Sequence, residues 1–163
     1  MDPHLVEQYR WLIEENDAFK GWTTLLYANR IKEIIEKHKA QTLLDYGCGQ
    51  GKQYDHELGW GVDVTLYDPA VLKFSEKPTG LFDGVICVDV LEHVPEDQVE
   101  EVIKDIFSYA RKFAFFTVCP RPARKTLPDG RNCHLTIKPV SWWYSIIEDL
   151  CPKGIEFEVK QND

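Results

Sequence analysis

The stretch Leu43–Gly51, LLDYGCGQG, decides the fold of this chain. A short apolar run ends in the acid Asp45, and glycines follow at alternate positions. Glycine carries no Cβ, so the segment can turn sharply and let a ligand lie against bare backbone. A pyrophosphate-binding dinucleotide loop has the order G-x-G-x-x-G, with its acid about 20 residues downstream. An acid that precedes the glycines instead favours a positively charged nucleoside without phosphate, and an ordinary glycine-rich turn is the alternative.

Two further segments place acids at the ends of predicted strands. Residues 62–68, VDVTLYD, alternate apolar and polar side chains and end in Asp68, which Pro69 follows. Residues 82–95, FDGVICVDVLEHVP, give a buried strand followed by Asp-Val-Leu-Glu-His at 89–93. Open parallel sheets bind ligands at the carboxyl ends of their strands, so we expect the three segments to converge in space.

These three motifs, in this order, resemble those of the class I S-adenosylmethionine-dependent methyltransferases. Residues 89–93 are similar to the fourth-strand segment of the ubiquinone-biosynthesis O-methyltransferases and their small relatives. The resemblance covers roughly residues 40 to 160 and implies methyl transfer with S-adenosylmethionine as the cofactor. It implies that the acid after the second strand accepts hydrogen bonds from both ribose hydroxyls. The cofactor-binding residues implied are Asp45, Tyr46, Gly47, Cys48, Gly49, Gly51, Asp68, Pro69, Asp89 and Val90.

The resemblance implies an α/β fold with a Rossmann-like, mostly parallel sheet, and residues 1–163 are expected to form a single domain. Only thirteen residues, 69–81, separate the second strand from the next. They are too few for the helix, third strand and helix of a full class I sheet, because one ordinary helix averages about 11 residues. We therefore expect the third strand to be short or missing, the seventh to be absent, and the strand order to be 2-1-4-5-6. Adenine recognition must then rely on other residues, with Asp89 and Val90 as candidates.

Helical spacing predicts two helices before the first strand, one from Pro3 and one over residues 22–35, which we expect to cover an edge or the mouth of the cofactor site. Further helices are predicted after Pro95 and Pro139, and strands over residues 113–119 and 155–159. Residues 120–138 form a long loop, of a length common in site lids.

Bulk properties exclude several classes of protein. Hydrophobic residues make up 44% of the chain, yet no apolar run approaches the ~20 residues of a membrane span. The amino terminus lacks the features of a signal peptide, and five cysteines without a Cys-x-x-Cys pair favour reduced thiols in the cytoplasm. A net charge of −8 argues against a whole-surface nucleic-acid binder but leaves a local basic patch open. The sequence predicts no oligomeric state.

The loop 120–138 is basic within this acidic chain. It contains Arg121, Arg124, Lys125, Arg131 and Lys138 against the single acid Asp129. Arginine pairs well with carboxylate and phosphate, so the loop predicts a small anionic acceptor: a saccharide, a nucleotide sugar or another metabolite. Arg121, Arg124 and Arg131 are the predicted acceptor-binding residues, and a solvated surface loop is the alternative. The Pro-Asp-Gly turn at 128–130 is placed to aim Asn132 and His134 inward.

His93 is the predicted general base, because it follows the fourth strand near the expected methyl group, with His134 as a second candidate. Packing under the loop is the alternative role for His93. Asp89, Glu92, His93 and His134 are also similar to the metal ligands of small-RNA 3′-end 2′-O-methyltransferases, although Asp89 replaces the usual Glu. The sequence leaves open whether a metal is used. It also leaves open a non-catalytic S-adenosylmethionine-binding partner subunit and a metal-assisted RNA 2′-O-methyltransferase.

Overall fold

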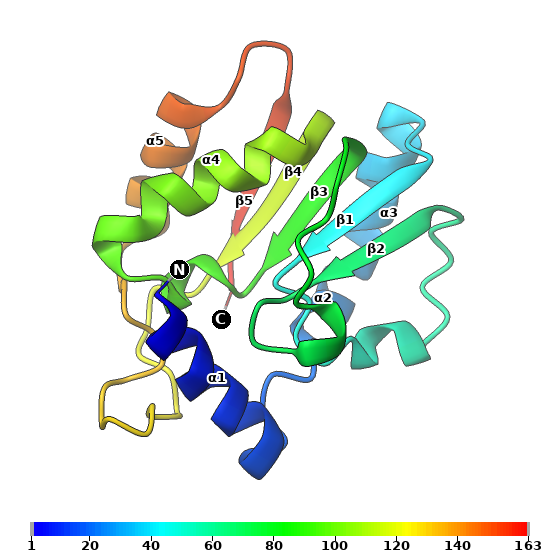
Figure 1. Cartoon of the computed structure of the whole chain (residues 1–163). Helices are drawn as coiled ribbons and strands as arrows, with labels where there is room; N and C mark the ends of the chain where they lie inside the picture. The colour runs from blue at the N-terminus through cyan, green and yellow to red at the C-terminus, as the bar shows by residue number, and fades with distance from the viewer. Residues whose placement is uncertain (1, 163) are drawn as a thin grey trace.

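The protein, described by a computed structural model over residues 2–162, is one parallel sheet between two layers of helices (Figure 1). The strands are β1 (Thr42–Tyr46), β2 (Asp63–Tyr67), β3 (Phe82–Val88), β4 (Ala110–Val118) and β5 (Glu156–Gln161). They lie in the order β2-β1-β3-β4-β5, and every neighbouring pair is parallel. Because β3, β4 and β5 are the expected fourth, fifth and sixth strands, this confirms the reduced Rossmann-like sheet. All five carboxyl ends meet at one edge.

Helices cover the two faces of the sheet separately. On one face lies α3 (Ala28–His38), whose Ile31, Ile34 and Ile35 pack against β1, β3 and β4. On the other lie α4 (Val99–Tyr109) and α5 (Val140–Leu150), which pack against the same strands and β5. The two remaining helices, α1 (Pro3–Asn16) and α2 (Thr23–Leu26), lie at the edge where the strands end (Figure 1). The expected helix over residues 22–35 is therefore two helices, which meet at Tyr27.

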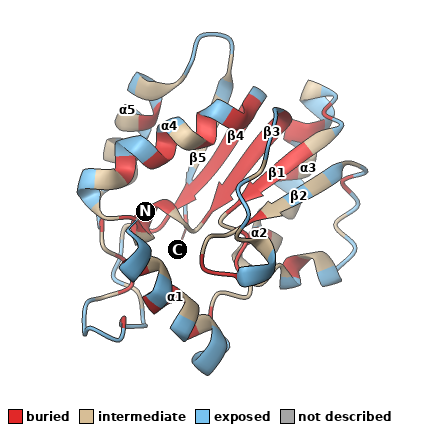
Figure 2. Cartoon of the chain, in the orientation of Figure 1, coloured by how far each residue is buried: buried red, intermediate tan, exposed pale blue. Residues whose placement is uncertain are grey.

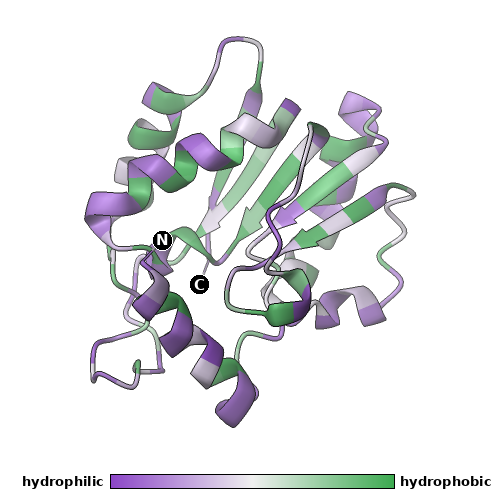
Figure 3. Cartoon of the chain, viewed as in Figure 1, coloured by the Kyte–Doolittle hydropathy of each residue, from purple (hydrophilic) through white to green (hydrophobic). Residues whose placement is uncertain are grey.

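The core follows the central strands. Every residue of β3 is buried, whereas β2 at the edge alternates in exposure (Figure 2). The same central strands carry the most hydrophobic side chains, while polar residues collect on the outer faces of the helices (Figure 3). Nowhere in residues 2–162 is a helix both long and apolar enough to cross a membrane.

The segment between β2 and β3 is the most reduced part of the fold. Its only helical element is the 3-10 turn η2 (Leu72–Phe74), after which the chain crosses the sheet beside α4 (Figure 1). One hydrogen bond ties this segment to α4: Lys77 Nζ donates to the Asp105 carboxylate at 2.9 Å. The same carboxylate accepts from Tyr46 Oη, at the end of β1, at 2.7 Å. The length argument for a missing third strand is thus confirmed, and no α-helix covers the part of this face between α4 and the β2 edge of the sheet.

Candidate active site

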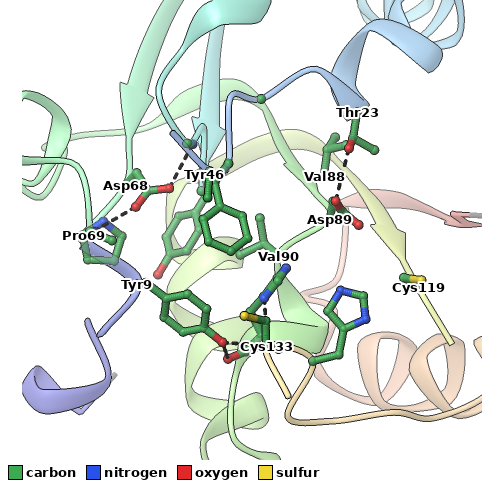
Figure 4. Close-up of a pocket in the computed structure, with 18 of the residues that line it drawn as sticks. Tyr9, Thr23, Tyr46, Asp68, Pro69, Val88, Asp89, Val90, Cys119 and Cys133 are labelled. Atoms are coloured by element: carbon green, nitrogen blue, oxygen red, sulfur yellow. Dashed lines mark hydrogen bonds between the residues drawn. The ribbon is translucent and has the colours of Figure 1, made fainter. Parts of the chain in front are cut away.

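A cavity of about 1230 Å³ opens at the carboxyl ends of the strands (Figure 4). Its walls come from the segment before α2, the glycine loop after β1, the ends of β2 and β3, and the loop after β4. Of the cofactor residues expected from the sequence, the cavity is lined by Tyr46, Gly47, Gly49, Asp68, Pro69, Asp89 and Val90. The other three, Asp45, Cys48 and Gly51, lie behind this lining and support it.

The glycines of the loop are required by contacts within the chain. Gly49 has φ +57°, and a Cβ there would lie 2.2 Å from the carbonyl oxygen of Phe19. A Cβ on Gly47, at φ +83°, would lie 2.4 Å from a methyl group of Val90. Gln50 N donates to the same Phe19 oxygen at 2.8 Å, so the segment before α2 is hydrogen-bonded to the glycine loop. The sequence suggests only that bare backbone lets a ligand approach, whereas the structure shows that it first lets the chain pack on itself.

Asp45 supports this loop from beneath, which corrects its expected place among the cofactor contacts. Its side chain is 1% exposed, and Oδ2 accepts hydrogen bonds from Gln53 Nε2 at 2.9 Å and Tyr54 Oη at 2.8 Å. Burial disfavours the charged form and raises the pKa of Asp45 to about 6. Cys48 is likewise buried, and a Cβ on Gly51 would press on Phe74.

Asp68 is presented to the cavity by backbone amides. Oδ2 accepts from Gly49 N and Oδ1 from Ala70 N, each at 2.9 Å (Figure 4). A carboxylate offers about four lone-pair positions, so one on each oxygen remains for a ligand. Burial raises the pKa of Asp68, and the backbone amides of Ala70, Gly49 and Val71 oppose that rise. A fixed carboxylate with two free lone pairs fits the vicinal hydroxyls of a ribose.

Asp89 lies at the end of β3 and is held from two sides. Its carboxylate accepts from Thr23 Oγ1 at 3.1 Å and Asn162 Nδ2 at 2.7 Å. Its own amide donates to Thr117 Oγ1 at 3.0 Å, and its φ of +62° lies in the left-handed region that L residues rarely adopt. Contacts to α2 and to the end of β5 thus fix a strained acid in the cavity wall, a pattern common at functional sites.

The two predicted histidines meet beside the cavity. The rings of His93 and His134 are 4.8 Å apart and nearly perpendicular. His93 Nδ1 lies 2.9 Å from the Cys133 carbonyl oxygen, and His134 Nδ1 lies 2.5 Å from that of Arg121. A carbonyl only accepts, so each Nδ1 carries the proton and each Nε2 keeps a lone pair. Burial and the neighbouring His134 lower the pKa of His93 to about 4, so His93 is neutral at neutral pH.

Neighbouring side chains set the position of this histidine pair. Asn132 Oδ1 accepts from the amides of Ala123 and His134, both at 2.9 Å, which confirms that the turn aims His134 inward. The Tyr9 hydroxyl on α1 lies 2.7 Å from the Cys133 carbonyl oxygen and 3.0 Å from that of His93. The loop after β4 and the helix α1 thus hold the two rings from opposite sides.

Glu92 lies beneath the histidines with an unsatisfied oxygen. It is fully buried; Oε1 accepts from Cys119 N at 2.6 Å, and Oε2 has no partner among the described residues. Ligand atoms of Glu92, Cys119 and His134 lie within 4.8 Å of one another. Burial and the nearby Asp89 raise the pKa of Glu92 well above its usual range. A buried carboxylate of this kind requires a proton or a cation, and this cluster fits a divalent metal ion.

The basic loop divides between the cavity and the protein's own acids. Arg121, Arg124 and Lys125 line the cavity, and within residues 2–162 no carboxylate lies at ion-pair distance from them. Arg131, expected to bind the acceptor, instead pairs with Asp129 at 2.7 Å and lies outside the cavity lining. Lys138 similarly pairs with Glu96 at 2.8 Å.

The Arg131 pair has a structural role. Asp129 also accepts a hydrogen bond from Gln8 on α1 at 2.8 Å, which ties the loop to the amino-terminal helix. These partners lower the pKa of Asp129 well below its usual range. The sequence could not predict this ion pair. Asp129 lies only two residues before Arg131, but nothing in the sequence distinguishes Arg131 from the other basic residues of the loop.

Residues 17–24 are the part of the site that sequence reasoning missed. All of them line the cavity; the Phe19 ring lies 5.3 Å from that of His93, and Trp22 is 54% exposed. Helical spacing favours a core role for the aromatic side chains of this segment. Gly21, between the two predicted helices, was the one sequence signal for a sharp turn that places these side chains outside the core. The expectation that the amino-terminal helices cover the mouth of the site is confirmed for α1 and α2, which both contribute lining residues.

Comparison with known proteins agrees with this geometry. A family model described as "Methyltransferase domain" matches residues 19–151, and the chain belongs to this family. The chain is also similar to a small RNA 2′-O-methyltransferase of Arabidopsis thaliana, with 28% identity over an alignment of 108 residues. That alignment covers 45% of this chain and 11% of the Arabidopsis protein, so the chain spans only a small part of the relative's length.

Family membership gives the general chemistry. The family supports a class I enzyme that transfers methyl groups, with S-adenosylmethionine as the methyl donor. The cavity fits this cofactor, because Asp68 offers lone pairs for ribose hydroxyls and Gly47 and Gly49 present bare backbone beside it.

Proposed function

We propose that the protein transfers the methyl group of S-adenosylmethionine to a hydroxyl of an anionic acceptor, at a centre formed by Glu92, His93 and His134. One observation carries the proposal: both histidines direct Nδ1 to backbone carbonyls, which leaves Nε2 as the lone-pair atom of each ring, and His134 lies beside a buried carboxylate with an oxygen unpartnered among residues 2–162. The histidine nitrogens of such a centre can accept a proton from the acceptor hydroxyl, and the centre can also bind a cation. Either would make the hydroxyl more reactive.

The chain's own residues supply orientation and proton transfer. S-Adenosylmethionine is already activated, so holding the acceptor oxygen in line with the sulfonium methyl supplies much of the catalysis. A hydroxyl must also lose its proton, and the neutral His93 has a lone pair on Nε2 that can accept it. The fixed Nδ1 contacts of both rings keep that lone pair aimed in one direction.

The same centre fits a divalent metal ion. Ligand atoms of Glu92 and His134 already lie within 4.8 Å of each other and of Cys119, and we expect the neighbouring His93 to complete the set, with Asp89 beside it. Histidines whose second nitrogen is tied to a carbonyl are typical metal ligands. A bound divalent cation would lower the pKa of the acceptor hydroxyl and hold it in place. The Asp89 carboxylate already accepts two hydrogen bonds, so its contribution is expected to be weaker than that of Glu92.

The basic segment 121–125 supports an anionic acceptor. Arg121, Arg124 and Lys125 line the cavity, and no carboxylate of residues 2–162 lies at ion-pair distance from them. Arg forms strong paired hydrogen bonds with phosphate and carboxylate. A phosphorylated saccharide or a nucleotide sugar offers both an anionic group and hydroxyls. These compounds are therefore the first acceptors to test.

A second candidate is methylation of the 2′-hydroxyl at the 3′ end of an RNA. The similarity to the Arabidopsis small RNA 2′-O-methyltransferase favours it, and so does the exposed Trp22 in the cavity wall, because bases stack on exposed aromatic rings. Phosphates of the RNA would then meet Arg121, Arg124 and Lys125.

Transfer of labelled methyl groups tests both candidates. The protein is incubated with labelled S-adenosylmethionine and either nucleotide sugars, phosphorylated sugars, or an RNA oligonucleotide with a free 3′-terminal diol. The same RNA after periodate oxidation, which destroys the diol, is the matched control. Each reaction is run with Mg²⁺, with Mn²⁺ and with a chelator. Transfer to any hydroxyl acceptor supports the proposal, and labelling of oxidised RNA or of nitrogen atoms alone contradicts it.

Variants of the histidines test the centre itself. His93→Ala and His134→Ala should each lower turnover by roughly 10²–10⁴ while leaving S-adenosylhomocysteine affinity unchanged. His56→Ala is the control, because His56 is exposed and does not line the cavity. Full turnover in both active-centre variants would assign the histidines to packing alone.

A further inference from the structure

An arm of the cavity extends along α4, where the segment between β2 and β3 forms no α-helix. Its floor is the aromatic pair Tyr46 and Tyr67, whose ring centroids lie 5.0 Å apart, with Val90 beside them. One wall is Lys77 from the crossing segment, and the other is Val102, Asp105 and Ser108 from α4. This arm joins the space in front of Asp68 and contains no group that the proposed methyl transfer uses.

The chemistry of the arm fits the base of the cofactor. S-Adenosylmethionine has a planar, largely apolar base at one end of its ribose and a charged amino-acid chain with the sulfonium at the other. The walls around Asp17, Lys20, Thr23 and Asp89 are polar and charged, which suits the amino-acid chain. The arm along α4 has an aromatic and aliphatic floor, and aromatic surfaces stack well on a heterocyclic base.

The rim of the arm carries an acceptor and a donor side by side. Asp105 accepts from Tyr46 Oη at 2.7 Å and from Lys77 Nζ at 2.9 Å, and its side chain is 25% exposed. The Lys77 side chain is 62% exposed, so its ammonium keeps further donors free. The edge of adenine shows the complementary pattern, an amine donor next to the N1 acceptor, whereas hypoxanthine shows the reverse.

We propose that Asp105 and Lys77 recognise the adenine of S-adenosylmethionine, with Asp105 accepting from the exocyclic amine and Lys77 donating to N1. Tyr46 holds the carboxylate in place and forms part of the surface beneath the base. The short segment between β2 and β3, together with α4, thus replaces the missing third strand in reading the base. Recognition of the base in this arm is independent of the acceptor.

Calorimetry with two ligands tests the proposal without catalysis. S-Adenosylhomocysteine and S-inosylhomocysteine share ribose and homocysteine and differ only at the edge of the base. The wild-type protein should prefer the adenosyl ligand by about tenfold or more, as expected for loss of a hydrogen bond to a charged group. Asp105→Ala should reduce that preference to within about twofold, and Lys77→Ala should reduce it partly.

Two controls keep the result interpretable. Asp97→Ala removes an exposed acid just before α4 that does not line the cavity, and it should keep the full preference. If Asp105→Ala does not fold, Asp105→Asn replaces it, because its amide can donate to the hypoxanthine oxygen and should also reduce the preference. Equal binding of both ligands by the wild type, or an unchanged preference in the Asp105 variant, would overturn the proposal. Failure of the wild type to bind either ligand would contradict the cofactor assignment as well.

Discussion

Gly49→Ala probes the contact between the glycine loop and the segment before α2. The new Cβ would lie 2.2 Å from the Phe19 carbonyl oxygen, which is backbone and cannot move independently. The segment must therefore shift, and the hydrogen bonds from Gln50 N to Phe19 O and from Lys52 N to Lys20 O weaken with it. Since residues 17–24 line the cavity, the change should reach the cofactor site.

The magnitude follows from two contributions. An L residue at φ +57° costs about 1–2 kcal/mol, and forcing a methyl group into a packed contact costs about 1–3 kcal/mol more. Gly61→Ala is the matched control, because Gly61 has φ +64° but a Cβ there would meet nothing within 4 Å. It should lose only the first contribution, about 1–2 kcal/mol.

Urea unfolding and calorimetry with S-adenosylhomocysteine measure the two effects. Gly49→Ala should unfold with about 1–3 kcal/mol less free energy than Gly61→Ala and should bind the ligand about tenfold or more weakly. Equal unfolding free energies and equal affinities in the two variants would refute the conclusion that the chain's own packing requires Gly49.

Three further changes have defined outcomes. Asp68→Ala should weaken S-adenosylhomocysteine binding in calorimetry by roughly 1–3 kcal/mol, because the ribose loses its acceptor, while the exposed-site variant Asp63→Ala should bind normally. Asp45 has a folded-state pKa of about 6, above its unfolded value. The free energy of unfolding of the wild type should therefore fall as the pH rises from about 4 to 7, by up to about 3 kcal/mol relative to Asp45→Asn. Parallel pH profiles of the two unfolding free energies would exclude this. Once an acceptor is known, Arg124→Ala should raise KM more than it lowers kcat, and Arg131→Ala should leave KM unchanged; the opposite pattern would place the acceptor elsewhere.

The fold was predictable because each of its signals is local. Alternating or continuous apolar runs mark the strands, and the thirteen residues from 69 to 81 fix the missing third strand by length alone. The position of Asp68 and Asp89 in the cavity lining was also predictable, because each directly follows a strand and the carboxyl ends of parallel strands meet at one edge.

The parts that sequence reasoning missed depend on contacts between distant segments. Phe19 reaches the site because its carbonyl oxygen packs on Gly49, thirty residues further along the chain. Asp105 lines the cavity and accepts hydrogen bonds from Tyr46 and Lys77, which belong to separate segments of the chain. No sequence pattern within one element predicts such contacts. The charge of a residue such as Arg131 likewise does not reveal whether its side chain pairs with a ligand or with a neighbouring acid.

The most direct test of the account is a crystal structure of the complex with S-adenosylhomocysteine. The account predicts the ribose hydroxyls on Asp68, the base over Tyr46 with its amine at Asp105, and the sulfur facing His93. A base stacked near His93 and His134, with the homocysteine chain along α4, would contradict it, because the sulfur would then point away from the proposed catalytic centre.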